Sequence, residues 1–182
     1  MQIKLLYITI LIVSIGLYAQ SVQPEIYEEN GLFGYRDQDN LIIIKAQFTA
    51  ALEFNEAGIA AVADSSGWMY IDKTGHILLR PFIYDNGPDY YVEGLARYVD
   101  NGKIGFFDQS GKIVIKARWD FAYPFHNGKA AVCSGCSEFS KGEYHSIKGG
   151  KWGYIDTAGQ LIDSLGTVNP DSVNKGVNLL KF

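Results

Sequence analysis

The sequence has few of the residues on which enzymes and metalloproteins depend. Its 182 residues include two cysteines and three histidines, and His76, His126 and His145 belong to no His-Glu-x-x-His or Gly-x-Ser-x-Gly motif. Lone histidines in strands, connectors and loops usually bond to water or to a nearby polar group. We therefore predict no catalytic residue and no cofactor. A pair of facing carboxylates, which would suffice for a glycosidase, stays open among the 20 acidic residues.

Positive charge is also scarce. The chain has 16 Lys and Arg against 20 Asp and Glu, which gives a formal net charge of -4 at pH 7. Proteins that bind nucleic acid or anionic lipid by charge carry a basic patch or stripe. The composition therefore predicts no nucleic-acid partner.

Only one long apolar run occurs, at the N-terminus. Lys4 precedes residues 5–17, which are almost entirely apolar, and Tyr18-Ala19-Gln20 follows. This layout is typical of a secretory signal peptide cut beside Ala19, and the run is too short to favour a membrane span. An uncleaved signal anchor is the alternative, because Leu17 is larger than the residue usual before the cut. We expect residues 1–19 to be a signal peptide and the rest to be periplasmic, cell-surface or secreted, without a membrane span.

What the chain does contain is one motif in four copies. Trp152-Gly153-Tyr154-Ile155-Asp156 has counterparts at 33–37, 68–72 and 104–108, spaced by 35, 36 and then 48 residues. Such periods are typical of repeat architectures. The residues that we expect to define the repeat are Phe33, Gly34, Trp68, Gly75, Gly105, Gly111, Trp152, Gly153 and Gly159.

A turn with Asp first and Gly last follows each motif, at 72–75, 108–111 and 156–159, and Asn40 replaces the Gly in the first copy. Asp can accept a bond from the backbone N–H two residues on, and Gly or Asn tolerates the positive φ of the last position. An apolar run such as 113–115 comes next, so each copy predicts a β-hairpin. The repeated Asp lacks an Asp-x-Asp-x-Asp-Gly loop, which favours a turn role over calcium binding.

A further strand precedes each hairpin. Gly-Ile-Ala or Gly-Leu-Ala patterns begin at Gly58 and Gly94, with a related one at Gly128, and Asn30-Gly31 and Asn101-Gly102 form tight turns. The unit is thus a three-stranded antiparallel meander. We predict an all-β repeat array of about four such meanders, solenoid-like or partial-propeller-like. The meanders span 25–45, 59–81, 95–117 and 129–162 within a domain at 20–162, and 163–182 is predicted to be a capping tail.

These motifs resemble the WG-repeat family, whose units follow a Trp-Gly-Tyr-Ile-Asp, turn-Gly, apolar strand and Gly-Leu-Ala order. The resemblance covers roughly residues 25–162, although only the copy at Trp152 keeps both residues that give the family its name. It implies a secreted or surface-associated bacterial β-repeat protein and brings no catalytic residues with it. The strand period of two places Trp68 with Tyr70, and Trp152 with Tyr154, on one face. We expect these aromatic side chains to form the core rather than a ligand platform.

The insertion from Cys133 to Gly150 holds a Cys-x-x-C pair, Cys133 and Cys136. In an exported chain a local disulfide is favoured. Zinc bound by Cys133, Cys136 and His145 would need Glu143 or His126 as a fourth ligand, and a redox pair would need a helix N-terminus; both remain alternatives, as do two ordinary thiols. We predict a loop, stiffened by the disulfide, that presents Glu143, Tyr144 and His145 to a partner.

The function that these features favour is an exported, non-catalytic binding or scaffolding module at the cell envelope. Repeat arrays present extended surfaces through their connectors and loops. The alternatives are a glycan-binding or glycan-cleaving protein and a metal-dependent or redox protein that uses the Cys133/Cys136 pair. The partner would be a protein or another envelope component.

Overall fold

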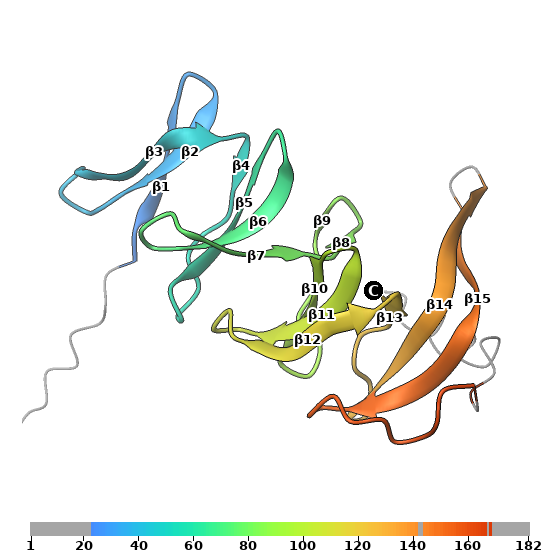
Figure 1. The fold of residues 1–182 in the computed structure, drawn as a ribbon. Helices are drawn as coiled ribbons and strands as arrows, with labels where there is room; N and C mark the ends of the chain where they lie inside the picture. Colours follow the sequence, from blue (N-terminus) through green and yellow to red (C-terminus); the bar gives the residue numbers. More distant parts are fainter. Residues whose placement is uncertain (1–22, 142–143, 167, 169–182) are drawn as a thin grey trace, which may run out of the picture.

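The computed structural model describes residues 23–141, 144–166 and 168 of the chain (Figure 1). These residues form 15 strands and no helix. Within this part of the chain no helix offers an apolar span that would cross a membrane. The strands are β1 (Glu25–Glu29), β2 (Leu32–Arg36), β3 (Ile42–Phe48), β4 (Ala50–Ala51), β5 (Ile59–Asp64), β6 (Gly67–Asp72), β7 (Ile77–Pro81), β8 (Ile83–Tyr84), β9 (Gly87–Pro88), β10 (Leu95–Asp100), β11 (Lys103–Asp108), β12 (Ile113–Trp119), β13 (Phe121–Ala122), β14 (Lys129–Lys141) and β15 (Tyr144–Asp156).

The predicted antiparallel meanders are present, and they follow one another along an extended array (Figure 1). The first is β1-β2-β3, the second β5-β6-β7 and the third β10-β11-β12. In the fourth, β14 pairs with β15, but the described residues after β15 form no third strand. Leu161 makes only an isolated bridge to Ile155, and the N–H of Ile162 donates to the carbonyl of Tyr154.

The predicted hairpin turns are confirmed. Gly75, Gly111 and Gly159 have φ of 85°, 80° and 79°, and Asn40 has φ of 63°. The Oδ1 atom of the first Asp accepts the N–H two residues on in every copy, at 2.8 to 3.0 Å. The four repeated Asp carboxylates are therefore engaged by their own turns. The Asn30-Gly31 and Asn101-Gly102 pairs also have positive φ at both residues, as a tight hairpin turn requires.

Replacing Gly111 by Val is expected to lower the free energy of unfolding by about 1 to 2 kcal/mol through the left-handed backbone penalty. A side chain there would also approach the Leu78 side chain of the previous repeat, 3.2 Å from the new Cβ. Urea titration would measure the loss. Gly111→Asn is the matched control, because Asn40 already occupies the equivalent turn position, and it should cost less than half as much. An unchanged midpoint for the Val variant would show that this turn does not constrain the fold.

Acid is expected to destabilise these turns. The hydroxyl of Ser110 holds the pKa of Asp108 below its usual 3.8, and the hydroxyl of Thr74 does the same for Asp72. A carboxyl group with a lower pKa in the folded state contributes stability above its unfolded pKa and loses it as pH falls through the folded pKa. The melting temperature should thus fall between about pH 4 and pH 2. Ser110→Ala should make this fall in melting temperature smaller. A melting temperature of the unmodified protein that does not change over this pH range would refute the argument.

The last strand of each meander bends and joins the first strand of the next. β3 continues into β4, which pairs with β5; β7 pairs with β10; and β12 continues into β13, which pairs with β14. Equivalent bonds mark the three crossings: the N–H groups of Leu52, Phe82 and Tyr123 donate to the carbonyls of Ala61, Arg97 and Ala131. Through these crossings the second and third meanders, with β4 added at one edge, form one seven-stranded sheet. The array is therefore held by backbone pairing as well as by side-chain packing.

The core lies between successive meanders, in separate clusters. Tyr35 and Ile44 of the first meander pack on Met69 and Ile71 of the second. Tyr70 of the second packs on Phe107 of the third, with ring centroids 5.2 Å apart. The third meander meets the fourth through Phe106, Ile115, Ala130, Val132 and Ile155. Tyr35, Tyr70, Phe106 and Trp152 are buried, as expected of core residues. Trp68 and Tyr154, which we also expected in the core, are half-buried and pack against its edge.

The insertion is not the loop that we predicted. β14 and β15 continue through it as one long hairpin, paired from Lys129 with Asp156 to Lys141 with Tyr144. The dozen added residues divide between the two strands, so they lengthen the hairpin without breaking its register. The hairpin stands out at one end of the array (Figure 1).

Candidate functional site

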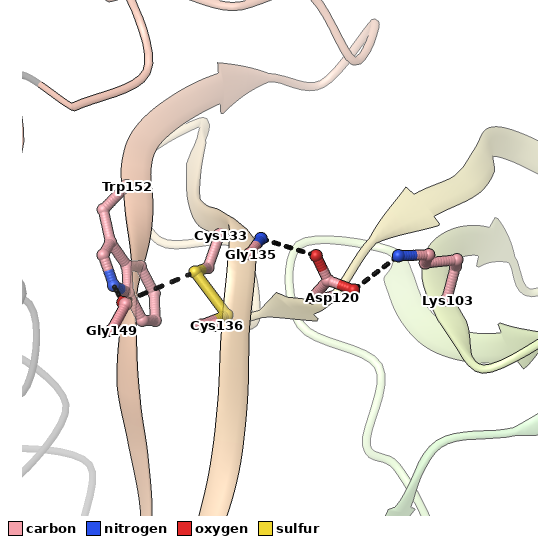
Figure 2. Close-up of a disulfide and its surroundings, with 7 residues drawn as sticks. All are labelled: Lys103, Asp120, Cys133, Gly135, Cys136, Gly149 and Trp152. Atoms are coloured by element: carbon pink, nitrogen blue, oxygen red, sulfur yellow. Dashed lines mark hydrogen bonds and ion pairs between the residues drawn. A yellow bond between two sulfur atoms is a disulfide. The ribbon is translucent and has the colours of Figure 1, made fainter.

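The Cys133–Cys136 pair lies on β14 and is joined by a disulfide (Figure 2). Residues three apart in a regular strand point to opposite faces, about 10 Å apart. Here the two Cα atoms are 6.1 Å apart, because Gly135 between them has φ of 79° and shortens the strand. Glycine in the middle of the Cys-x-x-C sequence thus brings the two sulfur atoms to the same side.

The opposite strand is shaped to receive this disulfide. Gly149 and Gly150 have φ of 73° and 70°, and a Cβ on Gly150 would lie 2.5 Å from the Cys133 sulfur. Trp152 donates its indole N–H to the carbonyl of Gly149 at 3.1 Å. Cys133 is fully buried, whereas Cys136 is half-buried. The disulfide is therefore packed into the hairpin, with only Cys136 near solvent.

A charged pair holds the kinked strand on its other side (Figure 2). Asp120 accepts the N–H of Gly135 at 2.7 Å and the ammonium of Lys103 at 2.5 Å. The bond from Lys103 lowers the pKa of Asp120. The kink at Gly135 is thus tied to β11 of the third meander, through a connector residue that follows β12.

The predicted presenting residues are only partly described. Glu143 lies outside the described residues, and Tyr144 and His145 pair through their backbones with Lys141 and Ser140. His145 therefore sits four positions along the hairpin from Cys136, roughly 13 Å at the usual strand rise. Such a separation does not favour a shared zinc ion. His126 is also placed elsewhere, in a bridge to Lys129. Among the described residues no group of three or more His, Cys, Asp or Glu side chains is arranged to hold a metal.

Replacing both cysteines by serine should leave the array folded. A disulfide that closes only four residues stabilises by about 2 kcal/mol in the chain-entropy account. Urea unfolding of Cys133→Ser with Cys136→Ser should show a loss of that size, with the β-sheet circular dichroism spectrum retained. Intact-mass measurement of the unmodified protein should show two hydrogens missing and no zinc. Two free thiols with one bound metal per chain would overturn the disulfide assignment.

Sequence reasoning missed a buried ion pair between Asp89 and Arg97. The guanidinium Nε and Nη2 donate to the two carboxylate oxygens at 2.7 and 2.8 Å, and Nη1 donates to the carbonyl of Ala122 at 2.9 Å. The guanidinium also lies 4.1 Å above the Phe82 ring. Arg97 is 3% exposed and Asp89 6%. Alignment of the repeats could have revealed this arginine, because Ala61 and Ala131 occupy the position of Arg97 in the second and fourth copies.

A second surprise is a row of exposed apolar side chains directly after the hairpin turns. In the first three copies the apolar run buries only its last residue, Ile44, Leu79 or Ile115, and the fourth copy buries neither Leu161 nor Ile162. The other residues of these runs are exposed by 37% to 68%, and they make up nine of the 13 large apolar side chains that are exposed in the described part of the chain. We call this set the turn ridge: Leu41, Ile42, Ile43, Ile77, Leu78, Ile113, Val114, Leu161 and Ile162.

The turn ridge follows one long side of the molecule. In Figure 1 the turns after β2, β6, β11 and β15 succeed one another along the lower left of the array. A shift of register accompanies the ridge in the first three copies, for example between the Phe106–Ile115 and Phe107–Ile113 pairs. Such a bulge interrupts the strict alternation of inward and outward side chains. Two consecutive apolar residues therefore reach the surface.

A groove of about 520 Å³ lies beside the turn ridge, between β12 and the last hairpin turn. Val114, Lys116 and Arg118 line it from β12, and Gln160 and Leu161 line it from the turn. Arg118 donates to the carbonyl of Gly159 at 2.5 Å, so its head is held at the groove wall.

Comparison with known proteins matches the chain to one family. The family model described as WG containing repeat matches residues 33–63, 68–103 and 104–135, which together are more than half of the chain. No match was found among curated proteins or among solved structures. Each matched segment begins at an aromatic strand and ends near the first strand of the following meander. The family unit therefore includes the crossing from one meander to the next.

Proposed function

Because the chain belongs to the WG containing repeat family, we propose that it is an exported, non-catalytic β-repeat protein that acts as a binding or scaffolding module at the cell envelope. The observation that carries the binding role is the turn ridge. Contiguous exposed apolar surface is unfavourable in water, and where it persists it typically marks an interaction site. Four successive repeats carry these side chains on turns that follow one side of the array, which suits recognition of an extended partner (Figure 1).

The repeated aromatic residues give less support to the glycan alternative. Tyr35, Tyr70 and Phe106 are buried between meanders and leave no ring face open to a sugar, whereas Trp68 and Tyr154 are half-buried. The redox and metal alternatives gain little from the Cys133–Cys136 disulfide, which is packed against Gly150.

Export is supported by the apolar segment that follows Lys4 and by the disulfide, since disulfides persist mainly in oxidising compartments. N-terminal sequencing of the protein from the envelope fraction should begin at Gln20 or Ser21. An intact Met1 in a cytoplasmic fraction would refute export.

Photo-crosslinking in cells would test the binding role. A photoreactive residue at Ile77 or Ile113, on the turn ridge, should yield a discrete crosslinked species. The same residue at Glu28, which is exposed on β1 away from the ridge, is the control. Equal crosslinking from Glu28 and from the ridge, or none from either, would argue against the ridge as a binding surface.

A further inference from the structure

The groove beside β12 has features that select a particular kind of partner. β12 pairs with β11 on one side only, and its other edge has no strand partner among the described residues. An exposed, apolar edge strand is a ready template for a further strand. The side chains that line the groove would then select among the strands that could pair with this edge.

The side chains at the groove are apolar at one end and basic at the other. Val114, Lys116 and Arg118 are exposed and all three line the groove, so they face it together although β12 bulges between Ile115 and Trp119. No acidic residue lines the groove, although the chain as a whole is acidic. Lys116 takes part in neither ion pair found among the described residues. Leu161 extends the apolar end beside Val114.

We propose that this groove binds an extended polypeptide segment of the order acidic-x-acidic-x-aliphatic, which adds to β12 as an antiparallel strand. Two residues that lie directly opposite one another across an antiparallel pair are on the same face of the sheet, and so are residues two apart along one strand. The two acidic side chains would oppose Arg118 and Lys116, and the aliphatic side chain would contact Val114 and Leu161. This inference rests on the proposed function, since it names the partner class of one part of the turn ridge.

Charge decides between a peptide and a lipid surface. An anionic membrane would approach the whole ridge, where the turns carry Asp37, Asp72, Asp108 and Asp156 on a chain of net charge -4. A single strand meets only the local groove, with its two cations. The groove therefore complements an acidic peptide better than an anionic bilayer.

Fluorescence anisotropy with a labelled synthetic peptide tests the inference. The probe contains Glu-Thr-Glu-Thr-Val, and the comparison peptide contains Lys-Thr-Lys-Thr-Val. The full chain should bind the first at least tenfold more tightly. Lys116→Glu should weaken binding roughly fivefold to tenfold, as expected when one exposed attraction becomes a repulsion. Because Lys116 is exposed, its variant should melt at the temperature of the unmodified protein.

Lys45→Glu is the matched control. β3 has the same pattern of burial as β12 and carries Lys45 at the position of Lys116, but Lys45 does not line the groove. The affinity of the Lys45→Glu variant for the Glu peptide should differ less than twofold from that of the unmodified protein. Equal weakening by both variants, or no binding of the Glu peptide, would overturn the inference. So would phosphatidylglycerol vesicles that bind with the same dependence on Lys116 while the peptide does not.

The crosslinking experiment separates this inference from the proposed function. If ridge crosslinks form in cells but the Glu peptide does not bind, the peptide class is wrong and the binding module stands. If ridge crosslinks and peptide binding both fail, both proposals are wrong.

Discussion

Replacing Arg97 by Met is expected to lower the free energy of unfolding by about 3 to 5 kcal/mol, one of the two largest single-residue effects in this chain. The reason is the carboxylate that remains. Asp89 is 6% exposed, and both of its oxygens accept bonds from the Arg97 guanidinium. Without that partner a charge stays buried, or a proton must be taken up. Urea unfolding followed by Trp fluorescence would measure the loss.

The double variant Asp89→Leu with Arg97→Met distinguishes the burial of a charge from the loss of packing. Apolar residues of similar size can replace a buried ion pair with little change in stability. The double variant should therefore recover most of the stability that Arg97→Met loses. If the single and double variants are equally unstable, the bond from Arg97 to Ala122 and the contact with Phe82 matter more than the pair itself.

This ion pair also explains how the connector after β7 is held. Asp89 follows the small β8-β9 hairpin, Arg97 lies on β10, and Ala122 lies on β13, which begins the crossing to the fourth meander. One guanidinium thus joins the connector, β10 and β13. Ala61 and Ala131, at the equivalent positions, lack such an anchor.

The sequence predicted the parts of the fold that are decided locally. A turn Asp and a turn Gly act within four residues, so the hairpins and the positive φ at Gly75, Gly111 and Gly159 followed from residue type. The strand period of two placed the aromatic residues of each motif on one face of its strand. The repetition of the motif indicated that successive copies pack against one another. These features need no knowledge of long-range contacts.

The parts that the sequence did not predict depend on partners elsewhere in the chain. An apolar run such as Ile113-Val114-Ile115 suggests burial, but the register shift beside β11 exposes its first two residues. No local pattern shows that β7 will pair with β10 rather than end its sheet. The insertion lies outside the repeated pattern, and the sequence therefore predicts a loop there. Its glycines, Gly135, Gly149 and Gly150, instead admit a disulfide within a hairpin.

The second position of the repeated motif is glycine in the first and third copies, where the backbone of the neighbouring strand comes too close for a side chain. The same cause explains why the second copy has no glycine there. In the first and third meanders the backbone of the last strand bulges toward Gly34 and Gly105. A tyrosine hydroxyl from the first strand accepts the N–H exposed by each bulge: Tyr27 at Ala46 and Tyr98 at Ala117. The second meander is shorter, because Pro81 follows Leu79 by two positions whereas Ala122 follows Ile115 by seven. The second meander keeps the register shift beside its hairpin turn but lacks this second bulge, and there Met69 replaces the glycine.

Gly105→Ala is accordingly expected to destabilise the protein by about 3 kcal/mol or more, at the upper end of overpacking effects, because the obstacle is backbone. The added Cβ would meet the carbonyl oxygen of Ile115 and lie 2.6 Å from the amide nitrogen of Ala117 and from the Tyr98 ring. The strand cannot withdraw without breaking the bond from Ala117 to Tyr98. Gly87→Ala is the matched control, since its Cβ would meet no atom within 4 Å and its φ is not positive. Urea unfolding should show almost no change for Gly87→Ala, and a Gly105→Ala protein as stable as that control would disprove the close approach of β12 to β11.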